Sequence, residues 1–147
     1  MKLTLPTCLL LCLGFIAALT GCMTTHKQDT GLSIELSALE RSADGTAKAH
    51  LILLNPSVVA YNLSESKHKV YLGGQFAGVI RIKDAVGLAA QNQATMDAVL
   101  VPEKGYSLPI SGRVTYRLET ELQIRIYGDS VEYTKLAGAG TVSITAK

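Results

Sequence analysis

The pattern of apolar and polar residues divides the chain into two parts. Residues 3–19 form a nearly continuous apolar run that carries no charge and is interrupted by Pro6. From Leu32 onward, apolar and polar residues alternate in short stretches separated by Gly, Pro, Asn and Asp. Alternation with a period of two is typical of strands that bury one face, and no stretch sustains the 3.6-residue period of a helix. The second part therefore predicts an all-β domain.

Seven or eight short strands are predicted in this domain. They cover residues 32–38, 47–54, 67–72, 75–82, 94–101, 113–126, 131–136 and 141–145. The second half of 47–54 is apolar on both faces, which favours a central strand. Residues 84–93 are expected to form a loop with at most one helical turn, because Gly87 disfavours a longer helix. The Gly-Ala-Gly sequence at 138–140 is expected to break the last strand into two.

Two turns define the predicted strand order most clearly. Asn55 and Pro56 end the second strand, because proline has no N–H for the ladder and asparagine can bond the backbone of the following loop. A recognition loop is the alternative interpretation of these two residues. Gly73 and Gly74 lie between two apolar runs and predict a two-residue hairpin, since primed turns require positive φ. The whole pattern predicts an antiparallel β-sandwich.

The apolar run near the N-terminus is typical of a secretory signal. It follows Lys2 and is shorter than the roughly 20 residues that a spanning helix needs. It closes with Leu19, Thr20, Gly21 and Cys22, which form a small-residue cleavage site followed by cysteine. These four residues resemble the lipobox of bacterial lipoproteins. The resemblance implies cleavage after Gly21 and lipidation of Cys22, with palmitate among the acyl chains; an uncleaved N-terminal anchor is the alternative.

The cysteines agree with a single anchored domain. Cys8 and Cys12 lie in the signal and Cys22 would carry lipid, so the remaining domain has neither a free thiol nor a disulfide. The predicted divisions are a signal peptide over residues 1–21, the lipidated cysteine and a polar tether over 22–31, and one β domain over 32–147. A flexible tether of this length reaches about 15–18 Å. Met23 stands where an acidic residue would favour inner-membrane retention, so the resemblance implies the outer membrane, facing the periplasm.

Two stretches of the β domain carry a family resemblance. Residues 49–57 read Ala-His-Leu-Ile-Leu-Leu-Asn-Pro-Ser, and residues 70–78 read Val-Tyr-Leu-Gly-Gly-Gln-Phe-Ala-Gly. They resemble the type 2 late-embryogenesis-abundant (LEA) proteins, also called the WHy (water stress and hypersensitive response) domain, and residues 114–118 are similar to the family's late strand. The motif residues are Asn55, Pro56, Gly73, Gly74 and Gly78. Ser57 stands where the family usually has Asn.

The resemblance has consequences for fold and function. It implies a fibronectin type III-like or immunoglobulin-like sandwich. Members of the family are associated with drought, cold and other stress, and with the protection of other proteins. It brings no catalytic residues to this chain.

The residues themselves predict no reaction centre. The histidines are His26, His50 and His68. They are scattered, without paired cysteines or a His-x-x-x-His spacing, so no metal site or cofactor is expected. Glu119 and Glu121 share one strand face, but Arg117 beside them favours ion pairs on a solvated surface over acid–base catalysis. With 14 − 12 = +2 charges and 5% aromatic residues, the chain also lacks the composition of a nucleic-acid-binding protein.

The predicted function is therefore that of a membrane-anchored, non-catalytic envelope lipoprotein. We expect it to protect proteins or the envelope during desiccation or other stress, with partly unfolded clients or envelope proteins as partners. The alternative is a periplasmic adaptor or ligand-binding module in envelope assembly that pairs with a partner through an exposed edge strand. An open pocket would favour the alternative, whereas a filled interior would favour protection.

Overall fold

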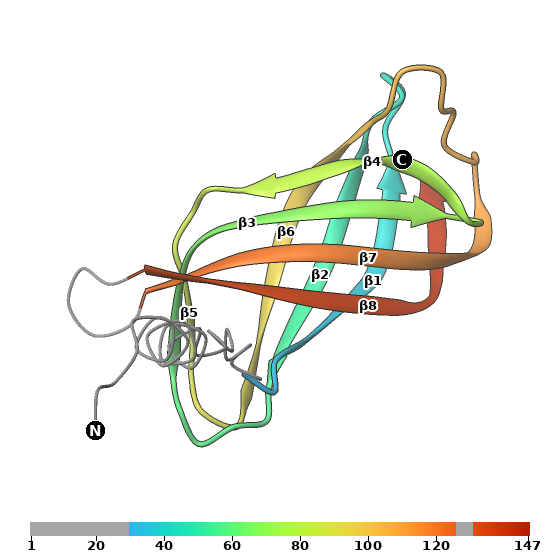
Figure 1. Ribbon diagram of the computed structural model, residues 1–147. Helices are drawn as coiled ribbons and strands as arrows, with labels where there is room; N and C mark the ends of the chain where they lie inside the picture. Colours follow the sequence, from blue (N-terminus) through green and yellow to red (C-terminus); the bar gives the residue numbers. More distant parts are fainter. Residues whose placement is uncertain (1–29, 126–130) are drawn as a thin grey trace, which may run out of the picture.

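A computed structural model describes residues 30–125 and 131–147 (Figure 1). These residues form eight strands and no helix, which confirms the predicted all-β class. The strands are β1 Ser33–Arg41, β2 Ala47–Asn55, β3 Tyr61–Leu72, β4 Gln75–Ile82, β5 Val86–Leu88, β6 Asn92–Pro102, β7 Gly112–Arg125 and β8 Val131–Ala146. Within the described ranges, no helix is long and apolar enough to cross a membrane.

The strands pair into one closed ring instead of the two separate sheets of the predicted sandwich. Their order is β4-β6-β2-β1-β8-β7-β3, and a further pairing between β4 and β3 completes a seven-stranded barrel. The short strand β5 pairs with β3 beside the ring. Figure 1 shows the long β3, β7 and β8 crossing in front of β6, β2 and β1. The structure has eight strands, within the predicted seven or eight, but β8 takes the place of two predicted strands and β5 was not predicted. The closure was not predicted either.

Two short sets of strand pairs, here called seams, close the strands into a barrel where a sandwich would leave two separate sheets. At one seam, residues 78–80 of β4 pair with residues 100–102 of β6. At the other, residues 38–41 of β1 pair with residues 143–146 of β8, and this pairing is parallel. The prediction of purely antiparallel pairing is therefore wrong at the β1–β8 seam. Both seams join strands distant in sequence, so neither has a local turn signal.

The barrel interior is filled by side chains from alternate positions of each strand. On β2 the odd-numbered residues are buried and the even-numbered ones are half-buried, so only one face enters the core. β2 pairs with β1 on one side and with β6 on the other, which confirms the predicted central strand. The largest fully buried side chains are mainly leucines: Leu36, Leu39, Leu51, Leu53, Leu72, Leu88, Leu100, Leu118 and Leu122.

Three strands differ most from those expected. β3 begins at Tyr61 instead of residue 67, because a bulge between Leu63 and Glu65 shifts the alternation that the sequence pattern depends on. β5 lies in the expected loop 84–93 and is recruited by pairing with the first residues of β3. β8 continues through residues 138–140, where a break was predicted.

Glycines at 138 and 140 let neighbouring groups approach β8 closely. A Cβ atom on Gly138 would lie 2.4 Å from the carbonyl oxygen of Ile34 on β1, and one on Gly140 would lie 3.1 Å from the ring of Tyr116. The Tyr116 hydroxyl accepts a hydrogen bond from the backbone N–H of Leu36 at 3.2 Å. Glycine inside a strand often marks such a close approach, so these residues belong to the strand and do not interrupt it.

Candidate functional site

The residues predicted to anchor the chain lie outside the described part. These are Leu19, Thr20, Gly21 and Cys22. His26 and the turn expected at residues 128–129 also lie outside it. The lipid anchor and the membrane location therefore remain predictions.

Asn55 is buried at the end of β2 and holds the following loop. Its Nδ2 group donates to the carbonyl oxygens of Val59 at 2.7 Å and Ala89 at 2.9 Å. Its Oδ1 atom accepts from the backbone N–H of Ser57 at 3.1 Å and from the Ser57 hydroxyl at 2.7 Å. Both ends of the amide are thus engaged within the protein, while Pro56 is exposed beside it. Such bonds organise a loop and leave the Asn55 amide no free group for a partner.

The three motif glycines shape the β3–β4 hairpin and its seam. Gly73 and Gly74 have φ of 57° and 83°, and Leu72 pairs with Gln75 across them, so the predicted two-residue turn is present. Gly78 has φ of 154°, and a Cβ atom there would lie 2.2 Å from the carbonyl oxygen of Val101. A side chain at residue 78 would force β4 away from β6 and open that seam.

His68 lies inside the barrel in a small polar cluster. Its Nδ1 atom is 2.9 Å from the Thr120 hydroxyl, and its Nε2 atom is 2.9 Å from the Ser66 hydroxyl. All three residues are buried, and burial lowers the pKa of His68 to about 4. The neutral imidazole donates from one nitrogen and accepts at the other, and a hydroxyl can serve either need. The cluster satisfies its own polar groups, so we assign it a structural role.

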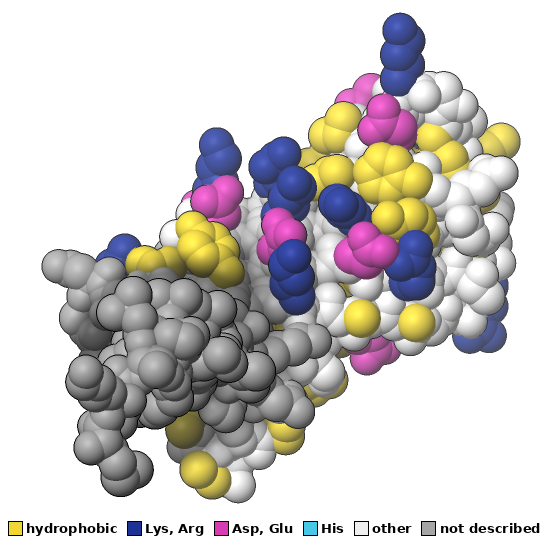
Figure 2. All heavy atoms as spheres, in the orientation of Figure 1, with side chains coloured by type: hydrophobic (Ala, Val, Ile, Leu, Met, Phe, Trp, Pro, Cys, Tyr) yellow, Lys and Arg dark blue, Asp and Glu magenta, His cyan; other side chains and the backbone are white. Residues whose placement is uncertain are grey.

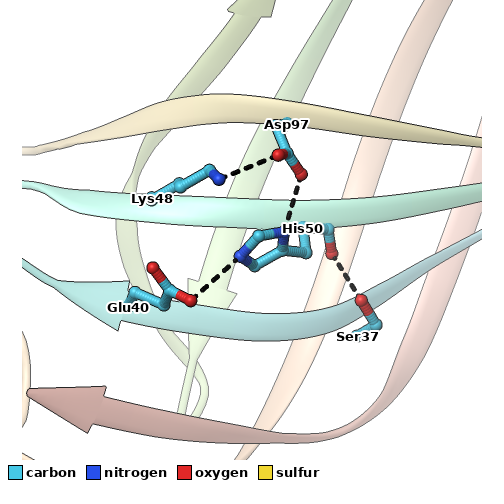
Figure 3. Close-up of polar contacts among 5 residues, drawn as sticks. All are labelled: Ser37, Glu40, Lys48, His50 and Asp97. Carbon is cyan, nitrogen blue, oxygen red and sulfur yellow. Dashed lines mark hydrogen bonds and ion pairs between the residues drawn. The ribbon is translucent and has the colours of Figure 1, made fainter. Parts of the chain in front are cut away.

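A second polar cluster lies on the outer face, across β1, β2 and β6 (Figure 3). His50 Nδ1 lies 2.6 Å from Asp97 Oδ1, and His50 Nε2 lies 3.4 Å from Glu40 Oε1. Lys48 Nζ lies 2.8 Å from Asp97 Oδ2. The Lys48 hydrogen bond, assisted by His50, lowers the pKa of Asp97, so this carboxylate is ionised and accepts from both.

This outer cluster does not have the geometry of a catalytic or metal site. The Ser37 hydroxyl donates to the backbone carbonyl of His50 at 3.0 Å, not to its imidazole, so no serine nucleophile is activated. Both imidazole nitrogens face carboxylates, and the Lys48 ammonium occupies the remaining oxygen of Asp97. In the described part of the chain, no group of three or more His, Cys, Asp or Glu is arranged to hold a metal.

The pairing of His50 with Asp97 was missed from the sequence. The two residues are 47 positions apart and meet only because β2 and β6 pair with His50 opposite Asp97. No local spacing signals a contact that depends on this register.

The carboxylates at 119 and 121 form ion pairs on the outer face of β7. Glu119 accepts from Arg117 and from the Tyr71 hydroxyl, and the Arg117 guanidinium lies 3.8 Å from the centre of the Tyr71 ring. Glu121 lies 3.6 Å from Lys135 on β8. The hydrogen bond from Arg117 is the main cause that lowers the pKa of Glu119. A carboxylate stabilised in its ionised form is a poor general acid, and this agrees with the predicted ion-pair face.

The short pairings between β4 and β6 and between β1 and β8 leave parts of the strand edges open, and the open part of β8 carries exposed apolar side chains. On its second side β8 pairs with β1 only over residues 143–146, and no described residue pairs with residues 131–137 on that side. We call this segment the β8 edge. Val131 is exposed there, and Tyr133 is 76% exposed. An unpaired edge presents a row of backbone donors and acceptors that a further strand can bond.

Solved structures of other proteins are similar to this one in fold. No family model and no curated protein sequence matches the chain. The solution structure of AT1g01470 from Arabidopsis thaliana is 19% identical, has a TM-score of 0.58, and is aligned over 79% of this chain and 83% of its own. The solution structure of At2g46140.1, described as a late embryogenesis abundant protein, is 16% identical and has a TM-score of 0.47. The alignment covers 90% of this chain and 78% of that one. The first of these similarities supports a shared fold, and neither assigns an activity.

Proposed function

We propose that the chain is a membrane-anchored, non-catalytic β module that protects partly unfolded envelope proteins during desiccation or other stress. The observation that carries this proposal is the β8 edge, an open edge on a barrel whose interior is otherwise filled. The resemblance of residues 49–57 and 70–78 to type 2 LEA proteins supports it independently.

The β8 edge suits the exposed segments of a partly unfolded protein. Such segments carry unpaired backbone groups and apolar side chains, which are the two features that lead unfolded chains to aggregate. A client strand beside β8 would gain backbone hydrogen bonds, while Val131 and Tyr133 would cover its apolar side chains. Lys135 on the same segment would discourage two copies of the barrel from pairing with each other, because charged residues protect natural edge strands.

Anchoring through Cys22 would hold this edge close to the envelope. By the lipobox resemblance the protein would carry acyl chains and lie at the periplasmic face of the outer membrane. The polar tether at 22–31 reaches about 15–18 Å, which keeps the barrel near the membrane surface.

A protection assay with matched surface variants tests the proposal. The mature chain carrying Cys22→Ser, which is free of lipid, is mixed with a labile enzyme before drying or mild heating. Serum albumin at equal mass controls for crowding. The enzyme activity that survives should be greater with the barrel, and Val131→Lys/Tyr133→Lys should remove most of the difference. Val58→Lys/Ile110→Lys, which charges exposed apolar positions elsewhere, should preserve it.

Two results would contradict the proposal. Protection equal to that of albumin would remove the stress function. Saturable binding of one envelope protein at a fixed stoichiometry, without protection of the labile enzyme, would favour the adaptor, which would use the same edge for a single partner strand.

A further inference from the structure

Cations are concentrated on the outer face of β4, β3, β7 and β8. The strand register places twelve outward residues there in three rows, Phe76–Tyr71–Arg117–Ala139, Val79–Lys69–Glu119–Ala137 and Arg81–Lys67–Glu121–Lys135. We call these twelve residues the basic face. It carries 5 − 2 = +3 charges, whereas the rest of the chain carries 9 − 10 = −1. Figure 2 shows basic and acidic side chains side by side, with hydrophobic side chains next to them.

Three of the five cations on the basic face have no ion-pair partner. Both acids of the face are engaged, since Glu119 pairs with Arg117 and Glu121 with Lys135. Among the described residues, no carboxylate lies within 4.0 Å of the charged groups of Lys67, Lys69 or Arg81. Lys69 still acts on Glu119 at longer range, and Lys67 faces Glu121 across the pairing with β7, so Arg81 is the least compensated of the three cations.

The register also places two of these cations directly opposite each other. Lys67 on β3 is the cross-strand partner of Arg81 on β4. Like charges directly opposite across a pair of strands destabilise the sheet. Glu121 lies opposite Lys67 on its other side and offsets part of this repulsion, and an anion bound near Arg81 would offset more of it.

An exposed apolar strip borders the basic face where the sheet continues onto β6. Val79 pairs with Val101, which is 60% exposed, and Val99 on the same side of β6 is 54% exposed. In the first row of the basic face, Phe76 on β4 and Tyr71 on β3 pack together, with ring centroids 5.4 Å apart. Aromatic and aliphatic groups beside cations are the combination that enters the interface of an anionic membrane.

The geometry points to the basic face and its apolar border as a docking surface for an anionic phospholipid bilayer. Four strands about 4.8 Å apart and three rows about 6.8 Å apart spread the cations over roughly 14 Å in both directions. A two-dimensional array of this kind matches a plane of headgroups better than it matches a linear polyanion. The basic face shares Lys135 and Ala137 with the β8 edge. The inference does not rest on the protective function, because it concerns outward side chains and not the unpaired backbone of that edge.

Vesicle sedimentation tests the inference with the lipid-free mature chain, Cys22→Ser. The probes are vesicles of phosphatidylglycerol and phosphatidylcholine in equal parts, and vesicles of phosphatidylcholine alone. Binding is expected to the first and not to the second, and it should weaken as sodium chloride is raised, because salt screens exposed charges. Lys67→Gln/Arg81→Gln should reduce partitioning about thirty-fold, at roughly five-fold per cation near the surface.

The variants separate loss of binding from loss of folding. Removing the Lys67–Arg81 repulsion should leave the melting temperature unchanged or higher, so weaker binding cannot be attributed to unfolding. Lys104→Gln/Lys147→Gln changes the net charge equally outside the basic face and should retain most of the binding. If the double variant does not fold, Lys69→Gln alone should reduce binding about five-fold.

Three results would overturn the inference. The first is equal binding to both kinds of vesicle. The second is equal loss of binding in the basic-face variant and the Lys104→Gln/Lys147→Gln control. The third is tighter binding to a linear polyanion such as duplex DNA than to phosphatidylglycerol vesicles at the same salt concentration.

Discussion

Replacing Gly138 by alanine should destabilise the barrel where β8 passes Ile34 of β1, next to the β1–β8 seam. The added Cβ would lie 2.4 Å from the carbonyl oxygen of Ile34, whereas real Cβ contacts are essentially never shorter than 3.0 Å. The two strands would have to separate by at least 3.0 − 2.4 = 0.6 Å. The contacted oxygen belongs to the backbone and a Cβ atom is fixed to its Cα, so no side-chain rotation can absorb this displacement.

The expected loss of unfolding free energy in Gly138→Ala combines two opposing effects. Overpacking in a well-packed region costs about 1–3 kcal/mol. Alanine also reduces the conformational entropy of the unfolded chain, which stabilises the folded protein by about 0.4–1 kcal/mol. The net loss of unfolding free energy is then about 1.5 kcal/mol. For a domain of this size, it corresponds to a decrease of roughly 6 °C in melting temperature.

Urea and thermal unfolding followed by circular dichroism measure this loss. Gly87→Ala is the matched control, because the nearest atom to its new Cβ, Asn62 Oδ1, is 3.8 Å away and its φ is not in the left-handed region. The control should be neutral or stabilising by up to about 1 kcal/mol. If Gly138→Ala were as stable as Gly87→Ala, the seam would be looser than the structure indicates and the close-approach explanation would fail.

Three further changes test other parts of the molecule. Burial lowers the folded-state pKa of His68 from 6.5 to about 4. The stability that depends on the neutral imidazole is therefore fully present above pH 6.5 and is lost as the pH falls toward 4. Urea titrations should show a loss of about 3 kcal/mol in the free energy of unfolding over this range, and His68→Gln should make that free energy depend less on pH. Asn55→Ala removes the amide that bonds the backbone of Ser57, Val59 and Ala89 and should cost about 2–4 kcal/mol in the same assay; a cost under 0.5 kcal/mol would show that water replaces the amide. Cys22→Ser should abolish labelling by radioactive palmitate, and labelling that persists would refute the lipobox interpretation.

Local patterns predicted those parts of the fold that depend on neighbouring residues. The bounds of β4 were predicted to the residue, and so was the turn at Gly73 and Gly74, because alternation and paired glycines act over a few positions. The start of β3 was missed because a bulge interrupts its alternation and because Ser66 and His68 put polar groups on the inner face. A polar residue that is satisfied inside a barrel has the same local pattern as an exposed one.

Features that depend on distant pairing were not predictable in this way. The barrel closes through three pairs between β4 and β6 and four pairs between β1 and β8, and neither set has a connecting turn. The Gly-Ala-Gly sequence at 138–140 resembles a strand break until the carbonyl of Ile34 and the ring of Tyr116 are placed beside it. The lipid anchor is the reverse case, because it is predicted from the local pattern of residues 19–22 alone and stays a prediction.

The parallel seam joins the first strand of the barrel to the last one. Residues 38–41 bond residues 143–146, so about a hundred residues of chain must be arranged before these pairs can form. Closing so long a loop is entropically costly, and folds dominated by such contacts form slowly. During synthesis the ring stays incomplete until residues 143–146 become available. These four residues thus determine when the nascent chain can complete the barrel.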